Sequence, residues 1–474
     1  MKDIDLHTSL VRSVIAANIE LSYFKDLDAS TYLSTTNAMS EYLATNNVFF
    51  EGKSIHSISL NPTVLTSDEV EHLSKDLQII RKLLLKVLDK FILDIRENVA
   101  NSPVVNYFHP YKKWFHIIAA EQRKSPAINL MRYDTVFDKE KGWQVMETNT
   151  CCPGGVISSA KIKDAWMKTP FAKKVCAHYT TTDFPIDSAT GFLRFLIECA
   201  RKASTITTCN IAICSYKDIF TNELQMLSDE FEKLISAEKI TNCKLILCDV
   251  RDINERAGII YAKDIPVSLI YNKIDQLMIN PDDSELNGWL AASHSQACEF
   301  FNSLGALYLT EAKRILSLLH DQSLRNYLNL SELECSTVDK RIPNTLILDK
   351  KDLDQLTFNR HKYVLKADSL TRGAGIYIGR DCTHEEWLKG IAETLDTHGV
   401  VQNVLNSPTK LSLHPKDDNN AASEFICAKE YYGLDLFFFA ENFAGGSSRA
   451  SISPIFNVGN GGSKSPVVTI VAEE

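Results

Sequence analysis

The chain has 474 residues, of which 23% are charged and 45% apolar, values typical of a globular protein and not of a disordered one. Its net charge of −9 argues against a general nucleic-acid binder, because affinity for the phosphate backbone depends on clustered lysine and arginine. No segment approaches the ~20 consecutive apolar residues of a membrane span, and the first residues lack the apolar centre of a secretory signal. The 12 cysteines include no CxxC pair and read mostly as reduced core residues, so we expect a cytoplasmic protein.

The N-terminal part, residues 1–104, is expected to be a helical region. Thr66 and Glu69 form a capping-box pattern, and apolar residues then recur at steps of three and four, as on one face of a helix. Residues 128–138 and 142–150 change to the period of a strand, and the charged turn between them predicts a β-hairpin.

From residue 189 to residue 304, strand and helix alternate, which is the pattern of a small parallel α/β layer. A change of composition near residues 185–190 favours a domain boundary there. The predicted strands cover 210–215, 243–250 and 266–273, and the predicted helices cover 191–203 and 223–236.

The remaining part, residues 305–474, mixes both kinds of element. Residues 424–433 and 434–443 are expected to pair as a hairpin, and a tail rich in glycine and serine follows them. Predicted helices cover 311–320 and 385–395, and predicted strands cover 345–349, 362–368, 376–380 and 400–405.

Arg132, Asp134, Glu147 and Asn149 are the strongest candidates for chemistry, because adjacent strands can bring them to one site. Two carboxylates and one amide oxygen form an all-oxygen ligand set of the kind that suits Mg²⁺. The Arg132 guanidinium would clamp a phosphate or carboxylate through charge-assisted hydrogen bonds. A surface hairpin with ordinary salt bridges is the alternative interpretation of the same residues.

Lys366 ends an expected strand and precedes a glycine-containing turn whose backbone N–H groups could cover a nucleotide phosphate. The turn is not a Walker loop, because the GxxxxGK[ST] pattern is absent. The strand at 400–405 could hold an adenine ring, and Arg449 with the Gly459–Gly462 turn could close over a site. Taken singly, Lys366 also fits a solvated lysine, residues 400–405 a core strand, and the segment of Arg449 and Gly459–Gly462 a surface loop. The sequence shows no zinc, GxSxG or GxGxxG signature.

The order of these motifs resembles that of the circularly permuted ATP-grasp ligases, and most closely the synthetase domain of glutathionylspermidine synthase and the eukaryotic-type glutathione synthetases. Glu147 and Asn149, the ExN pair, precede Lys366 by more than 200 residues, whereas in ordinary ATP-grasp proteins the ExN motif follows the nucleotide-binding lysine. The resemblance extends from about residue 105 onward. We divide the chain accordingly into a helical region at 1–104, a metal and substrate part at 105–188, an α/β substrate domain at 189–304 and a nucleotide-binding part at 305–474.

The resemblance also implies roles for single residues. Asp134, Glu147 and Asn149 match the metal-binding RxD and ExN residues, and Arg132 matches the arginine that stabilises the acyl phosphate. ATP would be bound by two lysines, the glycines of the phosphate loop, the segment that meets the adenine and an arginine of the closing C-terminal segment, namely Lys313, Lys366, Gly373, Gly375, Gln402, Asn403, Val404 and Arg449.

The chain departs from the family pattern at several positions. Leu370 stands where glutathione synthetases have a metal-ligating glutamate, with Asp368 as a candidate substitute. Asn403 stands where an acidic residue is common in the adenine segment. Cys151 and Cys152 follow the ExN strand, where relatives bind substrate, and both a thiol nucleophile and simple packing of a turn stay open. The cysteine–histidine amidase half of the bifunctional glutathionylspermidine enzymes has no counterpart here.

The resemblance implies an α+β or α/β fold of permuted ATP-grasp architecture and an ATP-dependent carboxylate–amine ligase. Such an enzyme uses ATP and Mg²⁺, forms an acyl phosphate, and releases ADP and phosphate as it makes an amide. Its partners would be a small-molecule carboxylate and amine, with neither nucleic acid nor membrane, and relatives often form a homodimer. Two alternatives stay open: a ligase acting on a carrier protein in natural-product assembly, and a non-catalytic nucleotide-binding regulator with the ATP-grasp fold.

Overall fold

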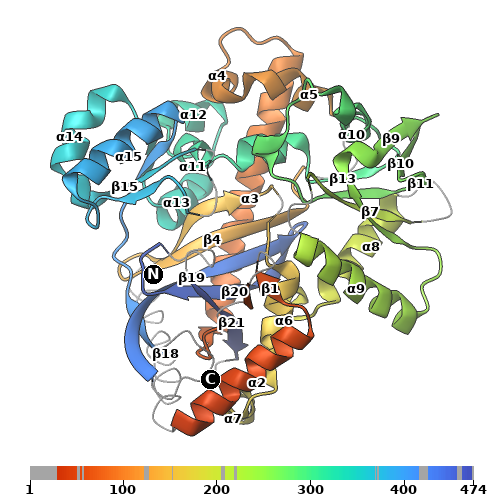
Figure 1. Ribbon diagram of the computed structural model, residues 1–474. Coiled ribbons are helices and arrows are strands. Elements are labelled where there is room, and N and C mark those ends of the chain that lie inside the picture. The colour runs from red at the N-terminus through yellow and green to blue at the C-terminus, as the bar shows by residue number, and fades with distance from the viewer. Residues whose placement is uncertain are drawn as a thin grey trace.

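The computed structural model describes residues 29–50, 54–55, 58–121, 127–151, 153–203, 209–217, 221–368, 370, 373–415, 425–455 and 462–471. Over these residues the chain is a mixed α/β protein, as expected, with one eight-stranded and two four-stranded sheets. In the view of Figure 1 the large sheet lies between the two smaller ones. Within the same ranges, no helix is long and apolar enough to cross a membrane.

The eight-stranded sheet joins segments that are far apart in the sequence. Its strands are β3 (Thr63–Thr66), β4 (Leu130–Asp138), β5 (Gly142–Asn149), β6 (Thr181–Thr182), β18 (Thr409–Pro415), β19 (Phe425–Phe439), β20 (Asn442–Ser451) and β21 (Ser463–Ile470). Their order is β3–β21–β20–β19–β4–β5, with β18 paired to β19 and β6 paired to β21. All pairings are antiparallel except that of β21 with β3. The hairpin predicted from the strand period is therefore confirmed as β4–β5.

The predicted parallel α/β layer is also confirmed. Its strands are β7 (Ile211–Ser215), β8 (Leu245–Asp249), β12 (Leu269–Asn272) and β13 (Glu299–Phe301), in the order β13–β12–β7–β8, all parallel. Helices α8 (Gly191–Ala203) and α9 (Thr221–Glu238) pack on it, as expected for crossover connections in such a layer. A small antiparallel sheet lies beside it and consists of β9 (Ile253–Arg256), β10 (Ile259–Ala262) and β11 (Ile265–Pro266).

The third sheet carries the segment around the candidate nucleotide lysine. Its strands are β14 (Thr345–Ile347), β15 (Tyr363–Lys366), β16 (Ile376–Ile378) and β17 (Val400–Asn403), in the antiparallel order β14–β17–β15–β16. Helices α14 (Leu353–Phe358) and α15 (His384–Asp396) contact each other, and α15 packs on β15 and β16 around the fully buried Trp387. This sheet has its own small core, separate from the two larger ones.

The N-terminal part differs from the expected all-helical region. Helices α2 (Ala29–Thr45) and α3 (Ser67–Arg96) are present, and the predicted capping box at Thr66 and Glu69 begins α3. Short strands β1 (Phe49–Phe50), β2 (Ser54–Ile55) and β3 lie between the helices. Because β3 pairs with β21, the residues before the capping box take part in the main sheet instead of continuing a helix.

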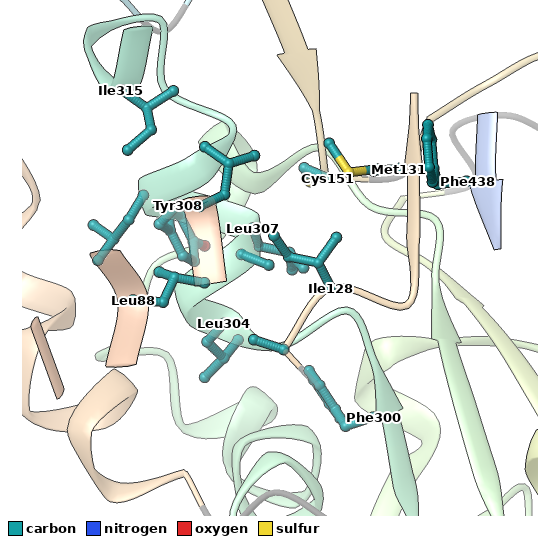
Figure 2. Packing of buried hydrophobic residues seen from close by; sticks show 14 of the residues in the cluster. Leu88, Ile128, Met131, Cys151, Phe300, Leu304, Leu307, Tyr308, Ile315 and Phe438 are labelled. Carbon is teal, nitrogen blue, oxygen red and sulfur yellow. The ribbon is translucent and has the colours of Figure 1, made fainter. Parts of the chain in front are cut away.

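The apolar face of α3 lies in the largest core of the protein. Its side chains meet β4 and the π-helical turn η6 (Ala306–Thr310), and Tyr308 of η6 stacks on Trp114 with ring centroids 4.0 Å apart. Figure 2 shows Leu88 of α3 in this cluster with Leu304 and Leu307. Full burial of each such leucine stabilises the fold by about 1.5–3 kcal/mol.

Two expectations for the C-terminal part are wrong. Residues 424–443 do not form a hairpin, because β19 continues through Gly433, which pairs with Val136 of β4 and Arg449 of β20. The turn comes at Ala440, whose φ is 51°. Arg449, expected in a segment that closes over the site, lies in β20, an inner strand of the sheet, so this part of the expected segment is not a closing loop.

The other helices are short and connect or cover these sheets. They are α4 (Pro103–Tyr107), α5 (Phe115–Ala120), α6 (Val156–Met167), α7 (Pro170–His178), α10 (Asn287–Ser293), α11 (Arg314–Leu318), α12 (Gln322–Tyr327), α13 (Glu332–Arg341) and the 3₁₀ helices η1 (His109–Trp114), η2 (Pro185–Asp187), η3 (Val250–Asp252), η4 (Gln276–Met278), η5 (Ser284–Leu286), η7 (Lys350–Asp352) and η8 (Arg360–Lys362). Within the helix expected at 311–320 only α11 is α-helical, and the π-turn η6 lies directly before the expected range.

Candidate functional site

The polar residues of the β4–β5 hairpin meet on one face of the main sheet. The register places Asp134 opposite Glu147 and Arg132 opposite Asn149. Residues two apart in a strand, and residues paired across strands, share a face. A bulge directly after Asp134 shifts the register beyond it, and bulges of this kind re-aim side chains beside functional sites. The structure therefore brings together the four residues that the sequence singled out.

Two arginines hold the Asp134 carboxylate. Arg132 donates from Nε to Oδ1 at 2.7 Å and from Nη2 to Oδ2 at 3.2 Å, and Arg449 of β20 donates to Oδ2. The Arg449 guanidinium also lies 2.7 Å from Oδ1 of Asp435 on β19. Burial would raise the pKa of Asp134, but the charges of Arg132 and Arg449 outweigh burial and hold that pKa well below its usual range. Asp134 is therefore ionised at neutral pH.

The oxygen atoms of the hairpin fit a cation unequally. Asp134 uses both oxygens with the arginines and with the Asn149 amide nitrogen, which donates to it at 3.0 Å. This bond leaves the amide oxygen of Asn149 for a cation, and the Glu147 side chain is 28% exposed. Glu147 and Asn149 thus fit a Mg²⁺ that takes its other ligands from phosphates and water. Across the described ranges, no group of three or more His, Cys, Asp or Glu residues is placed to hold a metal.

Two buried lysines lie beside Glu147. Lys366, the last residue of β15, donates to the carbonyl oxygen of Met146 in β5 at 2.9 Å. Lys313, directly before α11, donates to the carbonyl oxygen of Leu370 at 2.6 Å, and its Nζ lies 3.9 Å from Glu147. Burial lowers the pKa of Lys366 to about 8, although the Glu147 charge acts to raise it. Elements from three parts of the chain thus place one ammonium group at the Glu147 carboxylate and a second at the carbonyl of the preceding residue, Met146.

The turn after Lys366 is partly described. Gly373 and Gly375 have φ values of 79° and 66°, which glycine adopts more readily than other residues. A Cβ on Gly375 would lie 2.6 Å from the Cβ of Ala367, so the turn has no room for a larger residue there. Ser369, Thr371 and Arg372 of the expected phosphate loop lie outside the described residues.

The adenine segment proves more enclosed than expected. β17 is an inner strand paired on both edges, and Gln402 is buried with its Nε2 donating to Thr345 at 2.9 Å. The backbone N–H groups of Asn403 and Val404 donate to the carbonyl oxygens of Asn344 and Lys362. The backbone of the strand is therefore not exposed along a ligand edge, and any free edge begins after Val404.

Asp368, the expected substitute for a metal-ligating glutamate, is engaged by other residues of the fold. Its Oδ1 accepts from the backbone N–H of Arg314 at 2.8 Å, and its Oδ2 accepts from Arg314 Nε at 2.9 Å and from Tyr111 at 2.8 Å. Asp368 is 2% exposed. Its contacts tie β15 to the start of α11, and this is a structural role that leaves little capacity for a metal.

Cys151 packs in the largest core, as Figure 2 shows, and its Sγ contacts the carbonyl oxygen of Ile274 at 3.4 Å. This burial favours packing over a nucleophilic role; Cys152 lies outside the described residues. The Glu311 carboxylate accepts the backbone N–H groups of Thr150 and Cys151 at 2.5 and 2.7 Å. Burial raises the pKa of Glu311 to about 7, although the two backbone hydrogen bonds act to lower that pKa.

Sequence reasoning missed several charged residues around the site. Asp435 lies 1% exposed in β19, Lys464 lies 5% exposed in β21, and Arg314 is almost fully buried in α11. Asp435 carried a usable signal, because it is the one charge in the apolar run LDLFFFA. Lys464 carried none, since its neighbours are serines. Of the closing segment proposed for the C-terminal part, Arg449 is held in the sheet, and residues 456–461 lie outside the described residues.

Comparison with known proteins places the fold. No family model matches the chain, and no curated protein does. Among solved structures, a glutathione synthetase-like effector (GSS30) from Globodera pallida, in its apo form, is similar over 94% of this chain and 98% of that chain, with a TM-score of 0.63 and 10% identity. D-alanyl-alanine synthetase A from Vibrio cholerae, also at 10% identity, is similar over 49% of this chain and 68% of that chain, with a TM-score of 0.28. The similarity to GSS30 alone, over 94% of the chain, shows a fold of the glutathione synthetase-like kind.

Proposed function

We propose that the protein is an ATP-dependent ligase of the permuted ATP-grasp type, which joins a small-molecule carboxylate to an amine through an acyl phosphate. The observation that carries the proposal is that two buried lysines meet at adjacent residues of β5, Lys313 at the Glu147 carboxylate and Lys366 at the Met146 carbonyl. Two nearly buried ammonium groups are costly to place together unless an anion compensates them. A nucleotide triphosphate with Mg²⁺ is an anion of the right kind, and the glutathione synthetase-like fold supports this choice.

In this proposal each group has one task. Lys313 and Lys366 would hold phosphate oxygens of ATP, and Glu147 with Asn149 would hold Mg²⁺, which would supply positive charge to neutralise the phosphates. Arg132, fixed by Asp134, faces the carboxylate that attacks the γ-phosphate and stabilises the negative charge that develops there. The protein contributes mainly position and charge, because phosphoryl transfer needs little covalent help.

A second candidate is a nucleotide-binding protein without turnover. The specific observation in its favour is that Leu370 replaces the family glutamate while Asp368, the nearest carboxylate in the sequence, is engaged by Arg314 and Tyr111. Such a protein would bind the nucleotide and release no ADP when carboxylates and amines are added.

Thermal unfolding with Mg²⁺ and a non-hydrolysable ATP analogue tests the site. At ~100 times its Kd the analogue should stabilise the wild type by about 2.7 kcal/mol and raise its melting temperature. Glu147→Ala and Lys366→Met should lose most of this rise, whereas Lys362→Met, the same substitution at an exposed lysine of η8, should keep it. Absence of a rise in the folded wild type would refute the proposal. ADP release that depends on an added carboxylate then separates the ligase from the second candidate.

A further inference from the structure

A second basic centre lies at the other end of the Arg132–Arg449 cluster. Lys464 of β21 pairs in register with Arg449 of β20, and its side chain is buried. Its ammonium group donates one long hydrogen bond, at 3.5 Å, to the hydroxyl of Ser158 in α6. Within the described part of the chain, no carboxylate lies within 4 Å of this ammonium group, which separates Lys464 of β21 from the two buried lysines of α6.

The two buried lysines of α6 each have a carboxylate partner. Lys161 of α6 lies 2.6 Å from Glu230, and Lys163 lies 3.3 Å from Asp187. The Lys464 side chain reaches the first turn of α6 from β21 and has no carboxylate partner of this kind. Burial and the nearby arginines lower its pKa to about 8, as expected for a lysine short of negative charge.

The first turn of α6 supplies further donors. The helix has twelve residues, and its N-cap, Gly155, has a φ of 93° and offers no side-chain acceptor to the first turn. A Cβ on Gly155 would lie 2.6 Å from Lys464 Nζ, so the lysine is aimed directly at the cap. The Glu223 carboxylate, paired with Lys273 at 3.0 Å, accepts the Gly155 N–H at 3.1 Å. This bond satisfies the cap N–H, and the other N–H groups of the first turn still give the helix a positive end that adds to the field of Lys464.

The charges around this corner do not balance. Arg132, Arg449 and Lys464 bring three positive charges, while Asp134 and Asp435 bring two negative ones. Glu223 is already matched by Lys273. One more anion would complete the set. The ammonium group of Lys464 is the donor left for it, because the Ser158 hydroxyl already donates to the Gly155 carbonyl oxygen at 3.3 Å.

We propose that Lys464, Ser158 and the first turn of α6 form a binding site for an oxyanion group of a substrate, a carboxylate or a phosphate, beyond the reacting group held by Arg132. This inference rests on the proposed function, because it names the chemistry of the substrate of that site: a molecule with a second anionic group. A substrate of this kind would span the two ends of the arginine cluster.

The test is thermal unfolding in inorganic phosphate or acetate, compared with chloride at equal ionic strength. The wild type should gain stability with one or both oxyanions, and Lys464→Met should lose this gain while Lys464→Arg keeps part of it. Lys163→Met, which removes a buried lysine paired to Asp187, should keep the gain even if its melting temperature is lower. A response to acetate alone indicates a carboxylate group, and a response to phosphate alone indicates a phosphate group.

The same variants separate this inference from the proposed function. Lys366→Met should keep the part of the oxyanion response that Lys464→Met loses, because any phosphate bound at the nucleotide site does not depend on Lys464. An oxyanion response in Lys464→Met equal to that of the wild type overturns the inference, as does its absence in the wild type. If the wild type responds to the ATP analogue and not to oxyanions, only the second site fails. If it responds to oxyanions and not to the analogue, only the nucleotide proposal fails.

Discussion

Replacing Gly155 by alanine should destabilise the protein more than the same change at Gly142. Both glycines have positive φ, 93° and 72°, so an alanine at either position costs roughly 1–2 kcal/mol of backbone strain. The two positions differ in the room that surrounds an added Cβ. A Cβ on Gly142 has no atom within 4 Å, whereas a Cβ on Gly155 lies 2.6 Å from the ammonium group of Lys464.

The added cost at Gly155 comes from that displaced ammonium group. To clear the Cβ, Lys464 must give up its contact with Ser158 while it stays buried, and an unsatisfied buried polar group costs about 1–3 kcal/mol. We therefore expect a loss of about 2–5 kcal/mol for Gly155→Ala, against about 1–2 kcal/mol for Gly142→Ala. Urea unfolding followed by circular dichroism measures both changes.

A double-mutant cycle isolates the contact. In the background of Lys464→Ala the Cβ of Gly155→Ala meets no ammonium group, so its cost should fall to that of Gly142→Ala. The coupling energy between positions 155 and 464 should then be about 1–3 kcal/mol. Additivity of the two changes within about 0.5 kcal/mol would show that Lys464 does not face the helix cap, and the reasoning would be refuted.

Four other outcomes are expected. Lys366 has a folded-state pKa of about 8, below its value of ~10.4 in the unfolded chain, so between these pH values the unfolded chain binds more protons. As pH rises through this window, the free energy of unfolding of the wild type should therefore increase relative to that of Lys366→Met, by at most about 1.4 kcal/mol per pH unit. Urea titrations at several pH values measure this difference. The same pH dependence in both proteins would contradict a lowered pKa of Lys366. Asp134→Asn leaves two buried arginines without their shared carboxylate and should cost about 3–5 kcal/mol in urea unfolding, while a loss below ~1 kcal/mol would mean that the ion pairs are not formed. Asp368→Asn should lower the melting temperature and yet keep the response to Mg²⁺ and the ATP analogue, unlike Glu147→Gln; loss of the response in both would return Asp368 to the metal site. The Cys151 thiol should react with a disulfide reagent only in denaturant, and mass spectrometry of the native protein showing rapid labelling there would contradict its burial.

Local patterns in the sequence predicted the parts of the fold that depend on neighbouring residues. The β4–β5 hairpin follows from a strand period interrupted by a charged turn, and the α3 capping box follows from two residues three apart. The same local logic failed at Gly433, which looked like a turn. It lies inside β19 because strands on both sides supply its backbone hydrogen bonds, and one of them lies some 300 residues away in the sequence.

In the candidate site too, the sequence revealed the residues that are close together in the chain and missed the contacts between distant ones. Arg132, Asp134, Glu147 and Asn149 were found together because they lie in one hairpin. The contact of Arg449 with Asp134 spans 315 residues, and the engagement of Asp368 by Arg314 spans 54, so no local pattern could have revealed either. Lys464 is recognised only once β21 is seen to lie beside α6.

The order of strands in the main sheet also bears on how the protein is made. The β4–β5 hairpin leaves the ribosome about 290 residues before β19, the strand that covers its inner edge. At synthesis rates of ~5–20 residues per second, that edge waits roughly 15–60 s for its partner. During this interval the nascent chain exposes an apolar strand with unpaired backbone groups, the kind of surface that chaperones bind and that favours aggregation. Synthesis in a cell-free system with and without added chaperones should therefore change the yield of soluble protein, and slower translation should deepen the difference.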